Sequence, residues 1–213
     1  MTENLNPERA LIFRIVDVAN VPWILDHGLH CKNSPDQDPD FVNIGSPELI
    51  GKRAHRQVPV PPGGVLSDYV PFYFTPFSIM MFNIKTGWGG ITRRENRDIV
   101  IFVSSIHRLG ELGLPFLFTN QHAYPVDTEF YSRTADLDKI DWPLLQSKNF
   151  KTSDADPGRQ VRYQAEALVH RHVPLNALIG IGCHDGQVCE RLQSMVETRG
   201  LSLSVKATPI WYF

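Results

Sequence analysis

Runs of apolar residues, separated by segments rich in glycine, proline and polar side chains, divide this chain into short strands and helices. The clearest buried strand covers residues 98–103, where β-branched and aromatic side chains follow one another. Residues 9–19 and 114–119 predict two further strands. Shorter apolar runs near residues 178–182 and 201–205 predict two more.

Helices are predicted where a capping residue precedes a helix-compatible segment. Asn20 is the expected N-cap of a short helix that ends at Gly28, since glycine suits the position after a helix. Ser46 is the expected cap of a helix that runs through Arg53, and residues 136–147 also read as helical. Strands and helices in this irregular order predict an α+β fold.

An unusually aromatic segment, residues 68–82, allows two interpretations. Tyr73 and Phe74 are predicted to end a strand, Pro76 to break it, and Ser78 to start a short helix. The segment is then either a core strand followed by a core helix, or an apolar slot with hydroxyl groups at its mouth. Such a slot would hold a flat heteroaromatic ring by stacking and hydrogen bonds. Composition alone favours the core.

Length and composition are those of an ordinary globular protein. The chain has 213 residues, of which 42% are hydrophobic and 21% charged, so we expect a single domain over residues 1–213. No apolar run approaches membrane length, and residues 1–8 carry acids and no apolar stretch, so we expect neither a membrane span nor a secretory signal. Cys31, Cys183 and Cys189 are odd in number and lack zinc-site spacing, which predicts reduced core thiols and a cytoplasmic protein.

Charge is local rather than global. The formal net charge is −2, which excludes a strong overall attraction to nucleic acid. Residues 52–56 nevertheless contain three basic side chains, and residues 93–97 contain three with one acid. Such patches are usually solvated surface, but they are also where a polyanion docks.

Two charged residues lie in apolar surroundings. Arg14 interrupts the first predicted strand, so it must reach an anion or a carboxylate, extend to solvent, or face a cofactor. Glu166 follows a polar loop and precedes an apolar stretch that is compatible with helix or strand. If Glu166 is partly buried, its pKa is expected to be raised, which suits a general base. Otherwise it is a surface residue paired with Arg162, four positions earlier.

Four segments of the chain form a distinctive series: Ile44–Arg53, residues 59–64 (Pro-Val-Pro-Pro-Gly-Gly), Asp68–Ser78 and Arg162–Leu168. In this order and spacing they resemble the DarT family of bacterial toxins that ADP-ribosylate bases of single-stranded DNA. The order of Tyr73-Phe74 and Ser78 is similar to the wider ADP-ribosyltransferase superfamily, although Met81 stands where a second tyrosine is expected.

The resemblance implies an ADP-ribosyltransferase fold, with a split mixed β-sheet core, peripheral helices and NAD⁺ bound in a cleft as a substrate, without a metal. It implies that Glu166 and Arg53 are catalytic, with Arg56 as the alternative arginine. The expected NAD⁺-binding residues are Arg14, Tyr73, Ser78, Met80 and Arg53. The loop of residues 149–162 is expected to recognise the substrate, and the expected DNA contacts are Lys151, Arg159, Arg162, Tyr163 and His122.

The function that follows is NAD⁺-dependent ADP-ribosylation of a base in single-stranded DNA, with thymine as the expected acceptor and nicotinamide as the leaving group. One alternative keeps the chemistry but changes the acceptor to guanine, RNA or protein. Another is a non-catalytic module that binds nucleic acid or a nucleotide. The expected partners are single-stranded DNA, NAD⁺ and a macrodomain antitoxin, and the expected state is a monomer. The histidines lack the carboxylate-rich spacing of a metal-dependent nuclease.

Overall fold

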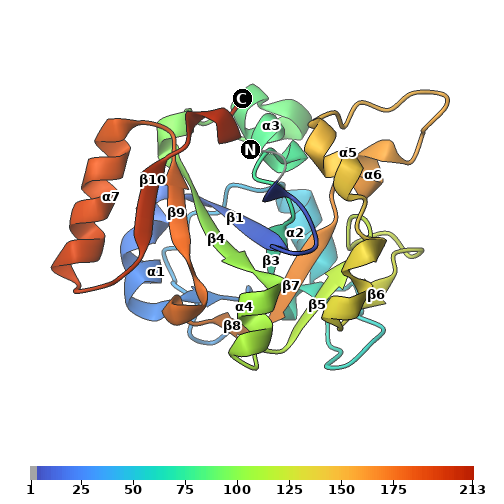
Figure 1. Cartoon of the computed structure of the whole chain (residues 1–213), viewed down its shortest axis with the longest axis horizontal. Coiled ribbons are helices and arrows are strands. Elements are labelled where there is room, and N and C mark those ends of the chain that lie inside the picture. The colour runs from blue at the N-terminus through green and yellow to red at the C-terminus, as the bar shows by residue number, and fades with distance from the viewer. Residues whose placement is uncertain (1–3) are drawn as a thin grey trace.

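A mixed β-sheet carries the fold. The computed structural model describes residues 4–213, so the expectation about a secretory signal in residues 1–8 falls partly on residues 1–3, outside the described part. The strands are β1 Leu11–Asp17, β2 Leu29–His30, β3 Tyr69–Tyr73, β4 Ile99–Ser105, β5 Phe116–Thr119, β6 Phe130–Tyr131, β7 Glu166–His170, β8 His172–Val173, β9 Gly180–Cys183 and β10 Ser204–Ala207. Within residues 4–213, eight of them form one sheet in the order β10-β9-β4-β1-β3-β7-β5-β6, and β2 pairs with β8 (Figure 1).

In the middle of this sheet β1 and β3 pair over a short length, and we call this junction the seam. β1 pairs with β4 along its whole length, from Leu11 to Asp17, whereas β1 meets β3 where Phe13 lies opposite Tyr73. β10 and β9 run parallel and the other neighbours antiparallel, so the sheet is mixed. Together with the peripheral helices, this confirms the α+β, ADP-ribosyltransferase-like fold, with the split between β1 and β3.

Short helices surround the sheet. They are α1 Val21–His27, α2 Pro47–Arg53, α3 Ile79–Thr86, α4 Ile106–Glu111, α5 Trp142–Ser147, α6 Arg159–Arg162 and α7 Gly186–Thr198. α2 begins as predicted, because the Ser46 hydroxyl accepts a hydrogen bond from the Leu49 amide at 3.3 Å. Asn20 precedes α1 but does not cap it with its side chain, which instead exchanges two hydrogen bonds with the backbone of Val42.

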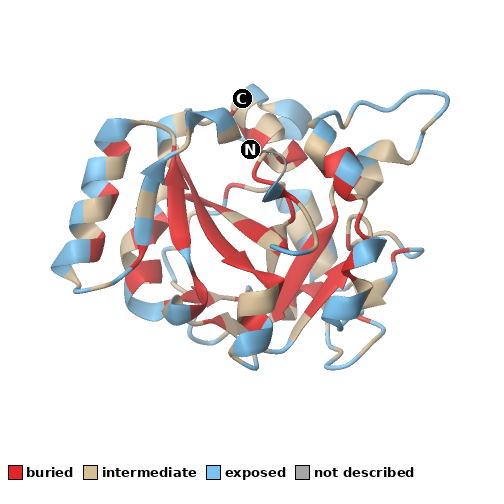
Figure 2. Ribbon diagram, viewed as in Figure 1, coloured by how far each residue is buried: buried red, intermediate tan, exposed pale blue. Residues whose placement is uncertain are grey.

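The longest helix, α7, had not been predicted. Two local features of the sequence nevertheless favour this helix. The Asp185 carboxylate caps it by accepting a hydrogen bond from the Val188 amide at 3.0 Å. Val188, Leu192 and Val196 recur at helical spacing. These three side chains are buried, and the helix lies beside β10 with its other face exposed (Figure 2).

The stretch before Glu166 also differs from expectation. The single helix predicted over residues 136–147 is a 3₁₀ helix, Thr134–Lys139, followed by α5, because Ile140 between them is extended. The chain then projects from the body between α5 and α6, and returns directly into β7 (Figure 1). Glu166 is therefore the first residue of a strand and not part of a helix.

Both interpretations of the aromatic segment apply, each to different residues. Tyr69, Phe72 and Phe74 are buried in the core, as composition suggested. Tyr73 ends β3 half-buried, and Ser78 begins α3. None of the helices in residues 4–213 has the length and apolar character needed to cross a membrane.

Candidate active site

A cavity of about 180 Å³ is lined by residues of β1, β3, β7, α2 and α3. These elements meet at the seam between β1 and β3, where Tyr73 lies opposite both Phe13 of β1 and Glu166 of β7. Six of the residues singled out from the sequence line this cavity: Arg14, Arg53, Tyr73, Met80, His122 and Glu166. Residues distant in the sequence are thus brought to one place.

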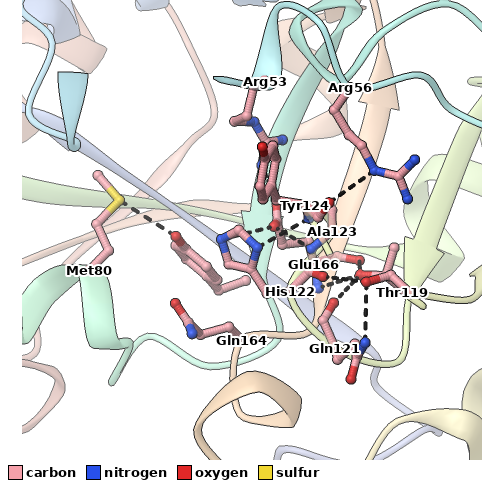
Figure 3. Close-up of polar contacts among 12 residues, drawn as sticks. Arg53, Arg56, Met80, Thr119, Gln121, His122, Ala123, Tyr124, Gln164 and Glu166 are labelled. Carbon is pink, nitrogen blue, oxygen red and sulfur yellow. Dashed lines mark hydrogen bonds and ion pairs between the residues drawn. The ribbon is translucent and has the colours of Figure 1, made fainter. Parts of the chain in front are cut away.

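The centre of the site is an ion pair between Glu166 and Arg53 (Figure 3). Arg53 Nη1 donates to Glu166 Oε2 at 2.9 Å, and the amide of Ala123 donates to Oε1 at 2.9 Å. The Glu166 side chain is 2% exposed, and that of Arg53 is 12% exposed. Both carboxylate oxygens are therefore held, and the acid has one orientation.

The pKa of Glu166 is lowered, not raised as predicted from its apolar surroundings. Burial is the largest influence and does raise this pKa, but the charge of Arg53, a contribution from His122 and the hydrogen bond from the Ala123 amide outweigh it. The carboxylate is therefore ionised at neutral pH. Because its folded pKa lies below the ordinary value of about 4.3, its contribution to stability is complete above that pH. That contribution is lost as the pH falls through the lowered pKa.

His122 lies beside the carboxylate as a neutral ring. Its Nδ1 accepts a hydrogen bond from the amide of Tyr124 at 3.1 Å, so the proton of the neutral form sits on Nε2. Nε2 faces Glu166 Oε1 at 3.9 Å, which is too long for a hydrogen bond. Burial lowers the pKa of His122, and Arg53 adds to this, while Glu166 acts in the opposite direction.

Arg14 and Tyr73 line the cavity from the two strands of the seam. Arg14 Nη1 donates to the carbonyl of Pro71 at 3.2 Å, whereas its Nε is buried without a hydrogen-bond partner among residues 4–213. Burial lowers the pKa of Arg14 to about 10, so the guanidinium stays charged at neutral pH. The Tyr73 hydroxyl donates to Met80 Sδ at 3.7 Å, and burial raises its pKa, so the phenol stays protonated.

Arg53 and Arg56, between which the sequence left the choice of site arginine open, make different contacts in the structure. Arg56 donates to the carbonyl of Tyr124 at 2.9 Å (Figure 3) and to that of Pro125 at 3.0 Å. Arg56 does not line the cavity. It therefore braces the loop that carries Ala123. Arg53 faces the cavity with a buried Nη2 that has no hydrogen-bond partner in the described part of the chain.

Two expected site residues have other roles. Ser78 is 1% exposed and does not line the cavity; its hydroxyl caps α3 by accepting from the Met81 amide at 3.2 Å. Tyr163 is 1% exposed and donates its hydroxyl hydrogen bond to the Phe77 carbonyl at 3.0 Å. Ser78 is thus not placed to hold the ligand amide directly, and Tyr163 packs in the core instead of stacking on DNA bases.

The basic residues of the loop 149–162 lie outside the cavity. Arg159 Nε donates to Asp156 at 3.1 Å, and Arg162 donates to Asp156 through two nitrogens at 3.1 and 3.0 Å. Arg162 also donates to Asp141 at 3.2 Å. Lys151 is exposed and makes no ion pair with the described residues. Arginines expected to bind phosphate are therefore already paired with carboxylates.

Sequence reasoning missed much of the remaining cavity wall. It includes the polar residues His30, Lys32, Gln37, Asn43, Asn83 and Gln164. Gln164 could have been identified as a site residue from the sequence, because it lies two positions before Glu166 in the segment Arg162–Leu168. The other five residues lie in segments that contain no recognised motif. No group of three or more His, Cys, Asp or Glu side chains in the described part of the chain could hold a metal ion.

Comparisons with known proteins show which family the chain resembles. Residues 13–213 match the family model DarT, described as ssDNA thymidine ADP-ribosyltransferase. A DNA ADP-ribosyl transferase of Escherichia coli O127:H6 (strain E2348/69 / EPEC) is 51% identical over 210 residues, which cover 99% of this chain and 96% of the relative. Thermus sp. 2.9 DarT in complex with ADP-ribosylated ssDNA has a TM-score of 0.88 at 29% identity, covering 97% of this chain and 98% of that one. The same protein in complex with NAD⁺ has a TM-score of 0.82 at 28% identity, covering 97% and 99%.

The influence of Arg53 on Glu166 can be measured directly. We expect Arg53→Met to raise the pKa of Glu166 above its ordinary value, because burial remains while the main opposing charge is lost. Titration of ¹³C-labelled glutamate carboxyls by NMR gives this pKa, with the signal assigned by its absence in Glu166→Gln. Arg56→Met is the matched control and is expected to leave the pKa unchanged. If the pKa of Glu166 stays low in Arg53→Met, Arg53 is not the main cause of its lowering.

Proposed function

The chain belongs to the DarT family of single-stranded DNA thymidine ADP-ribosyltransferases, and we propose that Glu166 and Arg53 carry out its reaction, with NAD⁺ as the donor of ADP-ribose. The family description favours thymidine over guanine, RNA or protein as the acceptor, and an enzyme over a non-catalytic binding module. The observation that carries the residue assignment is the buried ion pair at the cavity.

An ionised carboxylate fits the charge that this reaction develops. Breaking the bond between nicotinamide and ribose gives the anomeric carbon oxocarbenium character, the charge problem that glycosidases solve with carboxylates. Glu166 is fixed by Arg53 and Ala123 before the substrate arrives, so it stabilises the cation without having to reorganise. The bonding pair leaves with the ring nitrogen, which becomes neutral nicotinamide.

NAD⁺ supplies partners for the unsatisfied groups of the cavity. Arg14 Nε and Arg53 Nη2 are buried donors without acceptors, and a dinucleotide offers phosphate and hydroxyl oxygens. Tyr73 and Met80 supply an apolar wall for the nicotinamide ring, in contact through the Tyr73 hydroxyl and the Met80 sulfur. Ser78 supports this wall indirectly, by capping the helix that carries Met80.

The acceptor nitrogen is proposed to be thymine N3. A base can present N3 to the sugar only when it is unpaired, which accounts for a single-stranded substrate. Attack by N3 forms the new bond to the anomeric carbon and makes the N3 proton strongly acidic. The Glu166 carboxylate can then accept that proton despite its lowered pKa. Arg53 can bind a phosphate of the strand through its second guanidinium nitrogen.

Proposals about DNA contacts, oligomeric state, partner and compartment rest on membership of the same family. We propose that Lys151, Arg159 and Arg162 contact the DNA backbone and that His122 contacts the target nucleotide. The chain is proposed to act as a monomeric, single-domain toxin over residues 1–213. A macrodomain antitoxin that removes ADP-ribose is proposed as its partner. The cytoplasm is the proposed compartment, because it holds both NAD⁺ and bacterial DNA.

Removing the charge of Glu166 tests its role. We expect Glu166→Gln to lower kcat by about 10²–10⁴-fold, because the neutral amide can neither stabilise the cation nor accept the proton. Binding of NAD⁺, measured by calorimetry, is expected to persist. Nicotinamide release and the mass of the modified oligonucleotide report the reaction. Glu111→Gln, at an exposed pair with Arg108 on α4, is the control. Nicotinamide release at the wild-type rate from Glu166→Gln would assign the chemistry to another group.

The pairing of Arg159 and Arg162 with Asp156 makes a second prediction. We expect Asp156→Asn to lower KM for the oligonucleotide, because Arg159 loses its carboxylate partner and Arg162 keeps only Asp141, which leaves more of both guanidinium groups for phosphate. The slope of log affinity against log salt is expected to steepen by roughly 0.7 for each arginine that gains a phosphate contact. Asp154→Asn removes the same charge from the same loop and is expected to have a smaller effect. A higher KM for Asp156→Asn would mean that Asp156 shapes the loop for DNA.

A further inference from the structure

Trp88 is left in solvent directly after α3. Its side chain is 71% exposed, and among the exposed large hydrophobic residues of the described chain it is the sole aromatic one, the others being Val126, Ile179 and Ile210. An indole offers a large apolar face and normally contributes to a core or an interface. A tryptophan left in water on a polar surface therefore indicates a surface that binds something.

The backbone that carries this indole is anchored. Gly87 has a φ of 75° and ends α3 in the left-handed region, which favours glycine. The amide of Trp88 donates to Thr86 Oγ1 at 3.4 Å, and that hydroxyl donates to the Phe82 carbonyl at 2.8 Å. The turn is thus tied to the helix, and the indole is presented outward from a fixed base.

Arg93 is a cation near Trp88 that has no charged partner in the described part of the chain. Lys85 pairs with Glu95 at 3.3 Å, and Arg94 pairs with the buried Asp17 at 2.8 Å. Arg93 is exposed and makes no ion pair or side-chain hydrogen bond with the described residues. Its Cβ lies 3.8 Å from the position that a Cβ on Gly87 would occupy, so Arg93 leaves the backbone next to the turn that carries Trp88.

This turn lies on the rim of the cavity. Met80 and Asn83 of α3 and Ile91 beyond the turn all line the cavity, and Phe82 on the same helix packs against Phe150 of the loop 149–162, with ring centroids 5.7 Å apart. α3 therefore connects the cavity with the substrate loop. Trp88 follows Asn83 by five residues and comes directly after Gly87, which ends the helix, so the indole is carried by the turn next to the cavity wall.

We propose that Trp88 and Arg93 form a second DNA contact, in which a nucleobase flanking the target thymidine stacks on the indole and its phosphate binds the guanidinium. The proposal rests on the proposed function. A single strand combines exposed base faces with a phosphate charge, and an exposed aromatic side chain beside an unpaired arginine is complementary to both. Every base has a stacking face, so this contact adds affinity with little sequence preference.

Kinetics with substrates of two lengths test the proposal. We expect Trp88→Ala to raise KM about 5- to 150-fold for an oligonucleotide that extends several nucleotides on each side of one thymidine. KM for NAD⁺ and kcat at saturating oligonucleotide are expected to change little. KM for a trinucleotide with thymidine in the middle is also expected to change little, because a single flanking nucleotide on each side is too short to reach Trp88. Trp88→Tyr keeps an aromatic face and is expected to recover most of the loss.

A second variant and a control separate the outcomes. Arg93→Ala is expected to raise KM for the long oligonucleotide and to flatten the salt dependence of log affinity by roughly 0.7. Ile179→Ala, at another exposed apolar residue, is the control. An unchanged KM of Trp88→Ala for long oligonucleotides overturns the inference, as does an equal loss with the trinucleotide. The inference is also overturned if Trp88→Ala weakens binding to an antitoxin protein and leaves DNA binding unchanged. If the wild type modifies no oligonucleotide, the proposed function fails, whatever Trp88 does.

Discussion

The structure of the site depends on one buried ion pair, Arg53 with Glu166. The two residues are 113 positions apart in the chain, and their side chains meet at 2.9 Å with little exposure to solvent. Taking each charge out of water costs several kcal/mol, which close pairing and further hydrogen bonds must offset. The amide of Ala123 supplies such a bond to the second carboxylate oxygen. The fold must therefore bring α2, the loop after β5 and the first residue of β7 to one point.

That constraint also determines what the acid can do. A carboxylate bound at both oxygens and kept ionised by Arg53 is already arranged for a cationic transition state. It is a weak base before bond formation, so its first role is electrostatic. The seam between β1 and β3 supplies the space beside it, with Arg14 on one strand and Tyr73 on the other. The unpartnered nitrogens of Arg14 and Arg53 leave the cavity ready for an oxygen-rich ligand.

What the sequence could predict was mainly local. Ser46 followed by proline gave the start of α2, and the unbroken apolar run gave β4. Resemblance to DarT gave the family, and the structure brings Glu166 and Arg53 together. The lowering of the Glu166 pKa could not be predicted from the neighbouring sequence. The group that lowers this pKa most is Arg53, which lies 113 residues away in the chain. The burial of Tyr163 depends on packing against distant residues such as Phe150. Ser78 is predicted to start a short helix, and its hydroxyl caps α3. The helical spacing of buried residues in α7 is also a local signal, although no helix is predicted there.

The central claim is that an ionised Glu166 faces the nicotinamide ribose of NAD⁺. A crystal structure of this chain with a non-hydrolysable NAD⁺ analogue tests it most directly. We expect one Glu166 carboxylate oxygen at hydrogen-bond distance, about 2.6–3.0 Å, from a hydroxyl of that ribose, with Arg53 still paired to the carboxylate. A bound analogue whose nicotinamide ribose lies away from Glu166, beyond hydrogen-bond reach of either oxygen, would contradict the account.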